Sequence, residues 1–221
     1  MNRRFPLPPK DPRLQRLAQI LSDRHQRQGL LLQLSLAGNL GFAIFKLLYG
    51  FAISSTWITA MGIYYGILAI LRNSLLSGHK EAPQSPRDWR TYGRAGLYLL
   101  ILTLPMAALM VQVVLHGESY QYPGILIYAF ALFAFLKVGS ALRGVIVAHH
   151  GEHMGAIAAR QVTMVCALMS ILSLQTALNS RYDTDGSFSF ISNALYCFFV
   201  IVTVTLISVT MLVKAHRALH S

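Results

Sequence analysis

The sequence predicts an all-α membrane protein, a six-transmembrane-helix bundle with both termini in the cytoplasm, preceded by a short amphipathic interfacial helix. Two observations support this fold class: the 221-residue chain is 54% hydrophobic and only 12% charged, and apolar stretches of the ~20 residues that span a bilayer recur along it. The predicted spans cover residues 30–53, 57–76, 95–115, 123–147, 161–178 and 188–213.

The distribution of basic residues predicts how these spans cross the membrane. With both termini inside, the inner segments hold all of the 19 Lys and Arg residues except Arg181 on the outer side and Lys46 and Lys137 within spans. Cytoplasmic segments of membrane proteins carry such an excess of positive charge. We therefore expect a multi-pass protein of the cell (inner or plasma) membrane.

The chain divides into a cytoplasmic segment (1–28), a membrane domain (29–213) and a short cytoplasmic tail (214–221). In the first segment Leu14, Leu17 and Leu21 repeat at helical spacing beside arginines, which is typical of a helix lying in the membrane interface. A polar extension of the first span is the alternative. The +11 net charge then reflects contact with lipid headgroups rather than with nucleic acid.

Short polar segments mark the connections. Only Ser54, Ser55 and Thr56 separate the first two spans, which predicts a tight hairpin. Ser85 and Asp88 have the spacing of a capping box at the start of the third span, and Pro105 should kink that span. No nucleophile elbow, phosphate loop or acid pair occurs at a recognisable spacing. We expect no enzymatic activity and no cofactor.

Lys46 and Lys137 are the ionisable residues inside the predicted spans, and no Asp or Glu accompanies them. Intramembrane charges are costly and are therefore the first candidates for function. Each lysine is neutral, donates to polar neighbours, or faces a wet cavity that accepts an anion; snorkelling to the interface is the alternative, above all for Lys137. The candidate path residues are Lys46, Lys137, Asn39, Tyr64, Tyr65 and Gln175.

Two further patterns allow alternative readings. The loop at 148–155 carries His149, His150, Glu152 and His153, suitable zinc ligands, although a solvated interfacial loop without metal fits the short spacing better. Small residues in the first and fourth spans favour close helix packing, within the bundle, in a homodimer or against another membrane protein. They are Ala37, Gly38, Gly41, Ala43, Gly139, Ser140 and Gly144.

The first predicted hairpin contains Asn39, Lys46, Gly50, Ser54 and Ser55. In these residues it resembles the opening hairpin of cation diffusion facilitators, the zinc-transporter family. Six spans, internal termini and a His-bearing loop after the fourth span also resemble that family, as well as small uncharacterised six-span bacterial membrane proteins with lysines in the same spans. The resemblance implies a transporter-like fold. However, the stretches at 61–65 and 161–166, where the family's metal ligands would fall, contain no Asp or His, and only about eight residues follow the last span in place of the family's C-terminal domain.

Three functional hypotheses follow. The first is a small transporter-like protein in which the first, second, fourth and fifth spans surround a lysine-lined path for an anionic or polar solute. The second is a non-transporting membrane partner, sensor or scaffold that binds another membrane protein. The third, a substrate-binding subunit of an energy-coupling-factor importer, fits less well because the first outer turn is too short to cover a vitamin.

Overall fold

The computed structural model describes residues 24–77, 85–116, 124–146, 154–182 and 187–220. All regular structure in these ranges is α-helical, and each helix overlaps one predicted span. The predicted interfacial helix and the histidine loop lie outside the described residues. The helices are α2 (Arg24–Ala52), α3 (Thr56–Ser77), α4 (Pro86–His116), α5 (Gly124–Ile146), α6 (Met154–Tyr182) and α7 (Ser187–His220).

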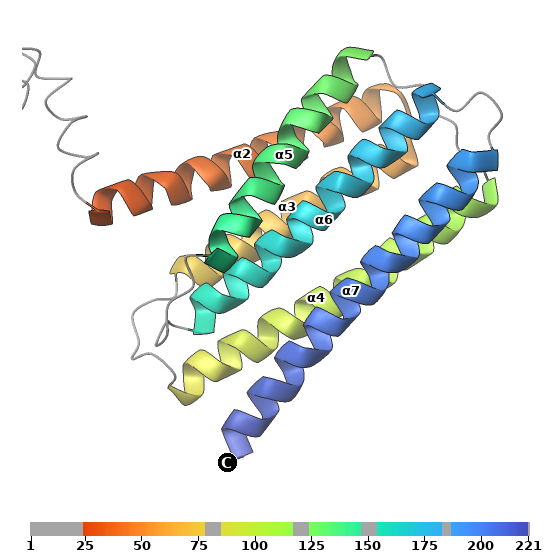
Figure 1. The fold of residues 1–221 in the computed structure, drawn as a ribbon. Coiled ribbons are helices and arrows are strands. Elements are labelled where there is room, and N and C mark those ends of the chain that lie inside the picture. The colour runs from red at the N-terminus through yellow and green to blue at the C-terminus, as the bar shows by residue number, and fades with distance from the viewer. Residues whose placement is uncertain (1–23, 78–84, 117–123, 147–153, 183–186, 221) are drawn as a thin grey trace, which may run out of the picture.

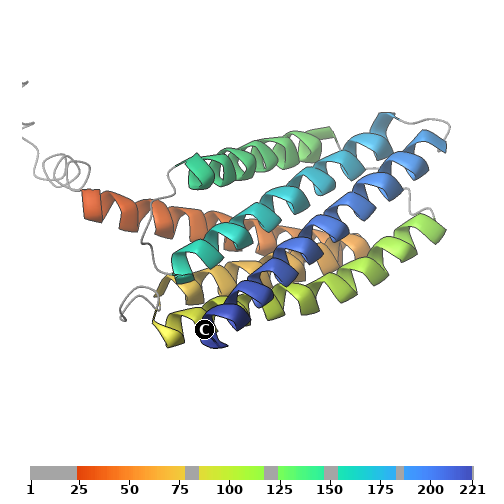
Figure 2. The same ribbon diagram turned by 60° about the horizontal axis from the view of Figure 1, so that its bottom comes forward.

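The helices run alternately in opposite directions, so α2, α4 and α6 point one way and α3, α5 and α7 the other (Figure 1). α2 packs on α3, α5 on α6, and α4 on α7. α6 is the central helix, since it contacts α3, α4, α5 and α7. Figure 2 shows α4 and α7 side by side along one flank, with α5 on the opposite flank.

The hairpin between α2 and α3 is as tight as predicted. Ser54 adopts a left-handed backbone conformation with φ of 54°, and the Ser55 hydroxyl accepts a hydrogen bond from the Ile58 N–H at 3.4 Å, an N-cap contact for α3. A side chain at Gly50 would collide with Thr59 of α3. The glycine therefore permits the two backbones to approach each other directly.

One of the two hydrogen bonds of the predicted capping box is observed at the start of α4, where the Asp88 N–H donates to the Ser85 hydroxyl at 3.2 Å. The Asp88 carboxylate has a second role: it accepts hydrogen bonds from the N–H groups of Met154 at 2.7 Å and Gly155 at 3.2 Å. A negative charge at a helix N-terminus satisfies free N–H groups and opposes the helix dipole. Asp88 thus joins the beginning of α6 to the beginning of α4.

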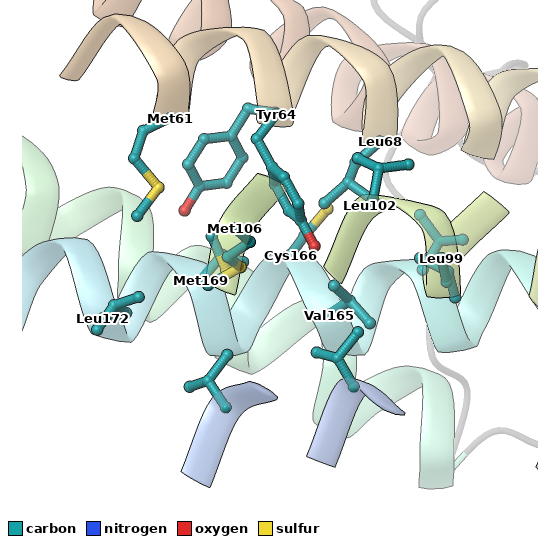
Figure 3. Packing of buried hydrophobic residues seen from close by; sticks show 14 of the residues in the cluster. Met61, Tyr64, Leu68, Leu99, Leu102, Met106, Val165, Cys166, Met169 and Leu172 are labelled. Carbon is teal, nitrogen blue, oxygen red and sulfur yellow. The ribbon is translucent and has the colours of Figure 1, made fainter. Parts of the chain in front are cut away.

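Apolar side chains fill the interior between α3, α4 and α6. Figure 3 shows Met61, Tyr64 and Leu68 of α3 facing α6 residues, with residues of α4 beside them. These labelled side chains are all buried. The α4 and α6 residues in this view are Leu99, Leu102, Met106, Val165, Cys166, Met169 and Leu172.

The outer surface is apolar as well. Large hydrophobic side chains such as Leu48, Phe51, Leu104, Phe135 and Phe198 are exposed, which suits contact with lipid tails. Within the described ranges, four helices, α3, α5, α6 and α7, contain segments long and apolar enough to cross a membrane, and α2 adds a shorter apolar segment, Leu36–Ala52. The chain is a multi-pass helical membrane protein.

The small residues named in the sequence analysis differ in their part in packing within the chain: Ala43 is buried against α3, whereas three of the glycines have open space beside them. A Cβ added at Gly38, Gly41 or Gly139 would meet nothing within 4 Å. The close helix contacts depend instead on Gly50 and Gly62 between α2 and α3, and on glycines of α4 against α7. Close packing within the bundle is therefore the wrong interpretation of Gly38, Gly41 and Gly139.

Candidate functional site

Lys46 projects from α2 into the interior, and only 2% of its surface is exposed. Its Nζ donates a hydrogen bond to the Ser173 hydroxyl of α6 at 2.8 Å. Three ring centroids surround the same nitrogen, those of Phe42 at 5.2 Å, Tyr65 at 5.3 Å and Phe130 at 4.7 Å. A desolvated cation–π contact contributes about 2 kcal/mol or more. The amine is held among helices and does not snorkel.

Tyr65 extends this polar cluster along α6. Its hydroxyl donates to the Ser170 hydroxyl at 3.0 Å, and Ser170 donates to the Cys166 carbonyl at 2.7 Å. Ser170 and Ser173 lie three residues apart and therefore share one face of α6. That face presents hydroxyl groups to the side chains of α2 and α3.

Aromatic rings bridge α2 and α5. No Cα atom of α2 lies within 8 Å of one in α5 among the described residues, so side chains span the distance between the two helices. Phe42 stacks on Phe133 with centroids 3.5 Å apart, and it meets Phe130 edge-on at 5.8 Å. Tyr65 also meets Phe133 edge-on, at 5.9 Å. The Lys46 ammonium is therefore enclosed by rings from three helices.

Lys137 is also held inside the bundle, with 6% of its surface exposed. Its Nζ lies 4.8 Å from the centroid of the Phe133 ring. In the part of the chain that the structure describes, this ammonium has no hydrogen-bond acceptor. Lys46 and Lys137 thus face the same bundle interior, but only Lys46 has a hydroxyl partner there.

Two of the other candidates are buried polar side chains whose oxygen has no partner among the described residues. Asn39 of α2 is 2% exposed and its Oδ1 accepts no hydrogen bond. The Tyr64 hydroxyl is also buried and unpaired, but Tyr64 belongs to the apolar packing between α3, α4 and α6 (Figure 3). The adjacent side chains of Tyr64 and Tyr65 therefore lie in different environments, and of the two only Tyr65 contacts Lys46.

Gln175 lies apart from the lysines. Its Nε2 donates to the Ser192 hydroxyl at 2.7 Å and to the Ser192 carbonyl at 3.2 Å. Neighbouring Asn179 donates to Asn193 at 2.9 Å. These amides link α6 to α7, so the inclusion of Gln175 in the lysine path has no support from the contacts.

Sequence reasoning missed the residues that hold the lysines: Ser170 and Ser173, and the rings of Phe42, Phe130 and Phe133. A signal was present for the rings. Phe42 precedes Lys46 by four residues, and Phe130 and Phe133 precede Lys137 by seven and four. These spacings place rings and amine on one helix face.

The predicted metal ligands His149, His150, Glu152 and His153 lie outside the described residues. Among those that the structure does describe, no three His, Cys, Asp or Glu side chains come close enough to hold a metal ion. No protein-family model matches the chain, and a search of curated proteins gives no significant match. The resemblance to cation diffusion facilitators stays a prediction.

Proposed function

We propose that this protein is a six-span, transporter-like membrane protein with a path for an anionic or polar solute between α2, α3, α5 and α6. The observation that carries the proposal is the burial of two lysine side chains, Lys46 and Lys137, inside that group of helices. Asp88 is the sole carboxylate residue in the described ranges, and it is engaged at the start of α6.

Electrostatics favours an anion on this path. A buried ammonium is costly unless an opposite charge or hydrogen bonds compensate it. Hydroxyls and rings compensate Lys46, whereas no carboxylate within the described residues neutralises either lysine. A metal cation on the same path would be repelled by both amines, while an anion would be attracted by both.

The ends of the helices support the proposed orientation. At one end of the bundle α4 and α6 begin and α3, α5 and α7 finish (Figure 1). The segments at this end carry Arg72, Arg90, Arg143, Arg160 and Lys214, whereas Arg181 belongs to the opposite end. We propose that the basic end faces the cytoplasm, in the cell membrane, by the positive-inside rule.

Flux measurements test the proposal. The full chain would be reconstituted in phosphatidylcholine liposomes and assayed with radiolabelled chloride, phosphate, lactate and glycerol. At least one anion should enter faster than into empty liposomes. Lys46→Met and Lys137→Met should each reduce this uptake about tenfold or more, since each removes a charge-assisted contact. Lys214→Met, at an exposed position, is the matched control.

Uptake equal to that of empty liposomes for all four solutes would contradict transport, as would equal rates in the two lysine variants and the wild type.

One observation favours a second candidate, a non-transporting membrane partner. Gly38 and Gly41 of α2 and Gly139 of α5 are exposed and have open space at their Cα atoms, as helix-packing glycines do before a partner helix approaches. Native mass spectrometry in mild detergent tests this. A complex that dissociates in Gly38→Leu and Gly41→Leu would support it, and a monomer in the wild type would contradict it.

A further inference from the structure

The four helices around the lysines present polar side chains in two layers. The first, which we call the Lys46 layer, consists of Lys46 and of Tyr65, Phe130 and Ser173, each of which contacts the Lys46 ammonium. Seven residues further along each helix, toward the basic end, lies a second set, which we call the Lys137 layer. It consists of Asn39, Arg72, Lys137 and Cys166.

The seven-residue offset between the two layers points toward the same end of the bundle on all four helices. α2 and α6 run opposite to α3 and α5 (Figure 1). A step of seven residues toward lower numbers on α2 and α6 therefore leads to the basic end, and so does a step of seven residues toward higher numbers on α3 and α5. At 1.5 Å per residue this step is about 10 Å, and it is close to two turns, so each pair shares one face of its helix. This register predicts a common level for the four side chains of the second layer.

Electrostatic interactions connect three members of this layer, Arg72, Lys137 and Cys166. Lys137 lies within electrostatic range of both Arg72 and Cys166, and Cys166 is within range of both cations. Cys166 is itself fully enclosed. Residues from α3, α5 and α6 are thus brought together here.

The two layers differ in how well their polar groups are satisfied. In the Lys46 layer the ammonium has a hydroxyl partner and three rings, and the Tyr65 hydroxyl has Ser170. In the Lys137 layer, Asn39 Oδ1 is buried without a donor, and the Lys137 ammonium has no acceptor among the described residues. Buried polar groups without partners are rare in native proteins and call for an explanation.

We infer that the Lys137 layer binds a small organic anion, a carboxylate that carries a hydroxyl or amino donor on the neighbouring carbon. Lys137 and Arg72 would receive the carboxylate, for which the guanidinium has the matching geometry. Asn39 Oδ1 would accept the hydrogen bond from the adjacent donor. The inference rests on the proposed function for its path, and it assigns the Lys46 layer as the closed barrier on the side of the α2–α3 turn.

Binding measurements on the full chain in phosphatidylcholine nanodiscs test the inference with three probes of similar size. Lactate has both the charge and the donor, propionate lacks the donor, and lactamide lacks the charge. By calorimetry, lactate should bind about tenfold more tightly than propionate, the usual effect of one hydrogen bond to a buried group. Lactamide should give no detectable heat.

Two variants assign the contacts. Asn39→Leu should bind lactate and propionate equally, and Lys137→Met should lose binding of both, whereas Lys214→Met should bind like the wild type. Equal binding of the three probes by the wild type, or unchanged lactate binding in Lys137→Met, would overturn the inference.

Thiol labelling provides a measurement that does not depend on folding of a lysine variant. In a Cys197→Ser background, N-ethylmaleimide reports on Cys166 alone, since the chain has two cysteines. Because Cys166 is enclosed, its labelling rate measures how often the Lys137 layer opens. Lactate should slow the labelling about tenfold at a concentration ten times its dissociation constant, by mass action, and lactamide should not. If phosphatidylglycerol in the nanodisc slows the labelling and lactate does not, the site binds a lipid headgroup. This result would overturn the inference that it binds a small organic anion.

The two proposals fail in distinguishable ways. Lactate binding that depends on Lys137, without lactate flux into liposomes, would retain the site and contradict transport. Flux that depends on Lys46, with lactate binding unaffected by Lys137→Met, would retain transport and overturn the site.

Discussion

The α4–α7 pair and the α2–α5 pair differ in how closely their backbones approach. α4 and α7 approach closely, because a Cβ on Gly93 would lie 3.0 Å from Ala215 and one on Gly96 would lie 2.8 Å from Met211. α2 and α5 stay apart among the described residues, and the Phe42 and Phe133 rings fill the distance between them.

The difference shows where the molecule keeps its polar groups. In the α4–α7 contact the buried Ser208 hydroxyl donates to the Val204 carbonyl of its own helix at 2.8 Å, so this hydroxyl needs no partner from another helix. Beside α2 and α5, the buried Lys46 ammonium takes its hydrogen-bond partner from α6, whereas the buried Asn39 oxygen has no partner among the described residues. The closely packed α4–α7 pair therefore contains no lysine of the proposed path, and the region bridged by side chains contains Lys46 and Lys137.

The largest expected effect tests the frame. Gly96→Leu would force atoms into Met211 and into the Ser208 carbonyl, which lies 3.1 Å from an added Cβ. We expect a loss of about 3 kcal/mol of stability, the upper range for overpacking, measured as a lower midpoint in thermal unfolding in detergent. Gly38→Leu, with open space around it, is the matched control and should unfold like the wild type. Equal midpoints for both variants would mean that α4 and α7 are not closely packed.

A second prediction addresses the Lys46 layer. Ser173→Ala removes the hydroxyl partner of a buried ammonium and should cost about 2 kcal/mol. Lys46→Met should be neutral or stabilising, because an apolar side chain of similar volume replaces a buried charge. The double variant should match Lys46→Met alone. Additive effects in this cycle would show that the two side chains do not interact.

A third prediction tests the link between α4 of the closely packed pair and the central helix α6. Asp88→Ala removes the acceptor for two N–H groups at the start of α6 and should cost about 1 kcal/mol, as loss of an N-cap does. Hydrogen exchange at Met154 and Gly155 should accelerate, with no change at the start of α3. Asp88→Ser, which keeps a capping oxygen, tests whether the carboxylate itself is needed. Unchanged exchange in Asp88→Ala would contradict the capping role.

The smallest effect is expected at Gln175. Gln175→Leu loses two hydrogen bonds to Ser192 and should cost roughly 1 kcal/mol. Solute uptake should stay at the wild-type rate, since the side chain contacts α7 and not the lysine layers. A fall in uptake comparable to that of Lys137→Met would place Gln175 on the path after all.

The sequence was sufficient to predict the helices and to single out Lys46 and Lys137 within them. The length of an apolar stretch and a charged residue inside it can both be recognised locally. The sequence was insufficient for the partners of these lysines: Lys46 and Ser173 are 127 residues apart, and no local pattern relates them. α6 begins at Met154, before the predicted span of 161–178, and a carboxylate of α4 caps this beginning. The contact of Gln175 with Ser192 of α7 could not be predicted either, because α6 contacts four helices and the sequence does not indicate which of them a given α6 residue meets.

The Asp88 contact has a mechanical consequence. It fastens the first residues of α6 to the first turn of α4 at the basic end of the bundle. Any rearrangement of α6 that preserves these hydrogen bonds must swing about that point. The greatest displacement then falls at the far ends of the helices, near the α2–α3 turn, where the rings around Lys46 would be the first contacts to separate.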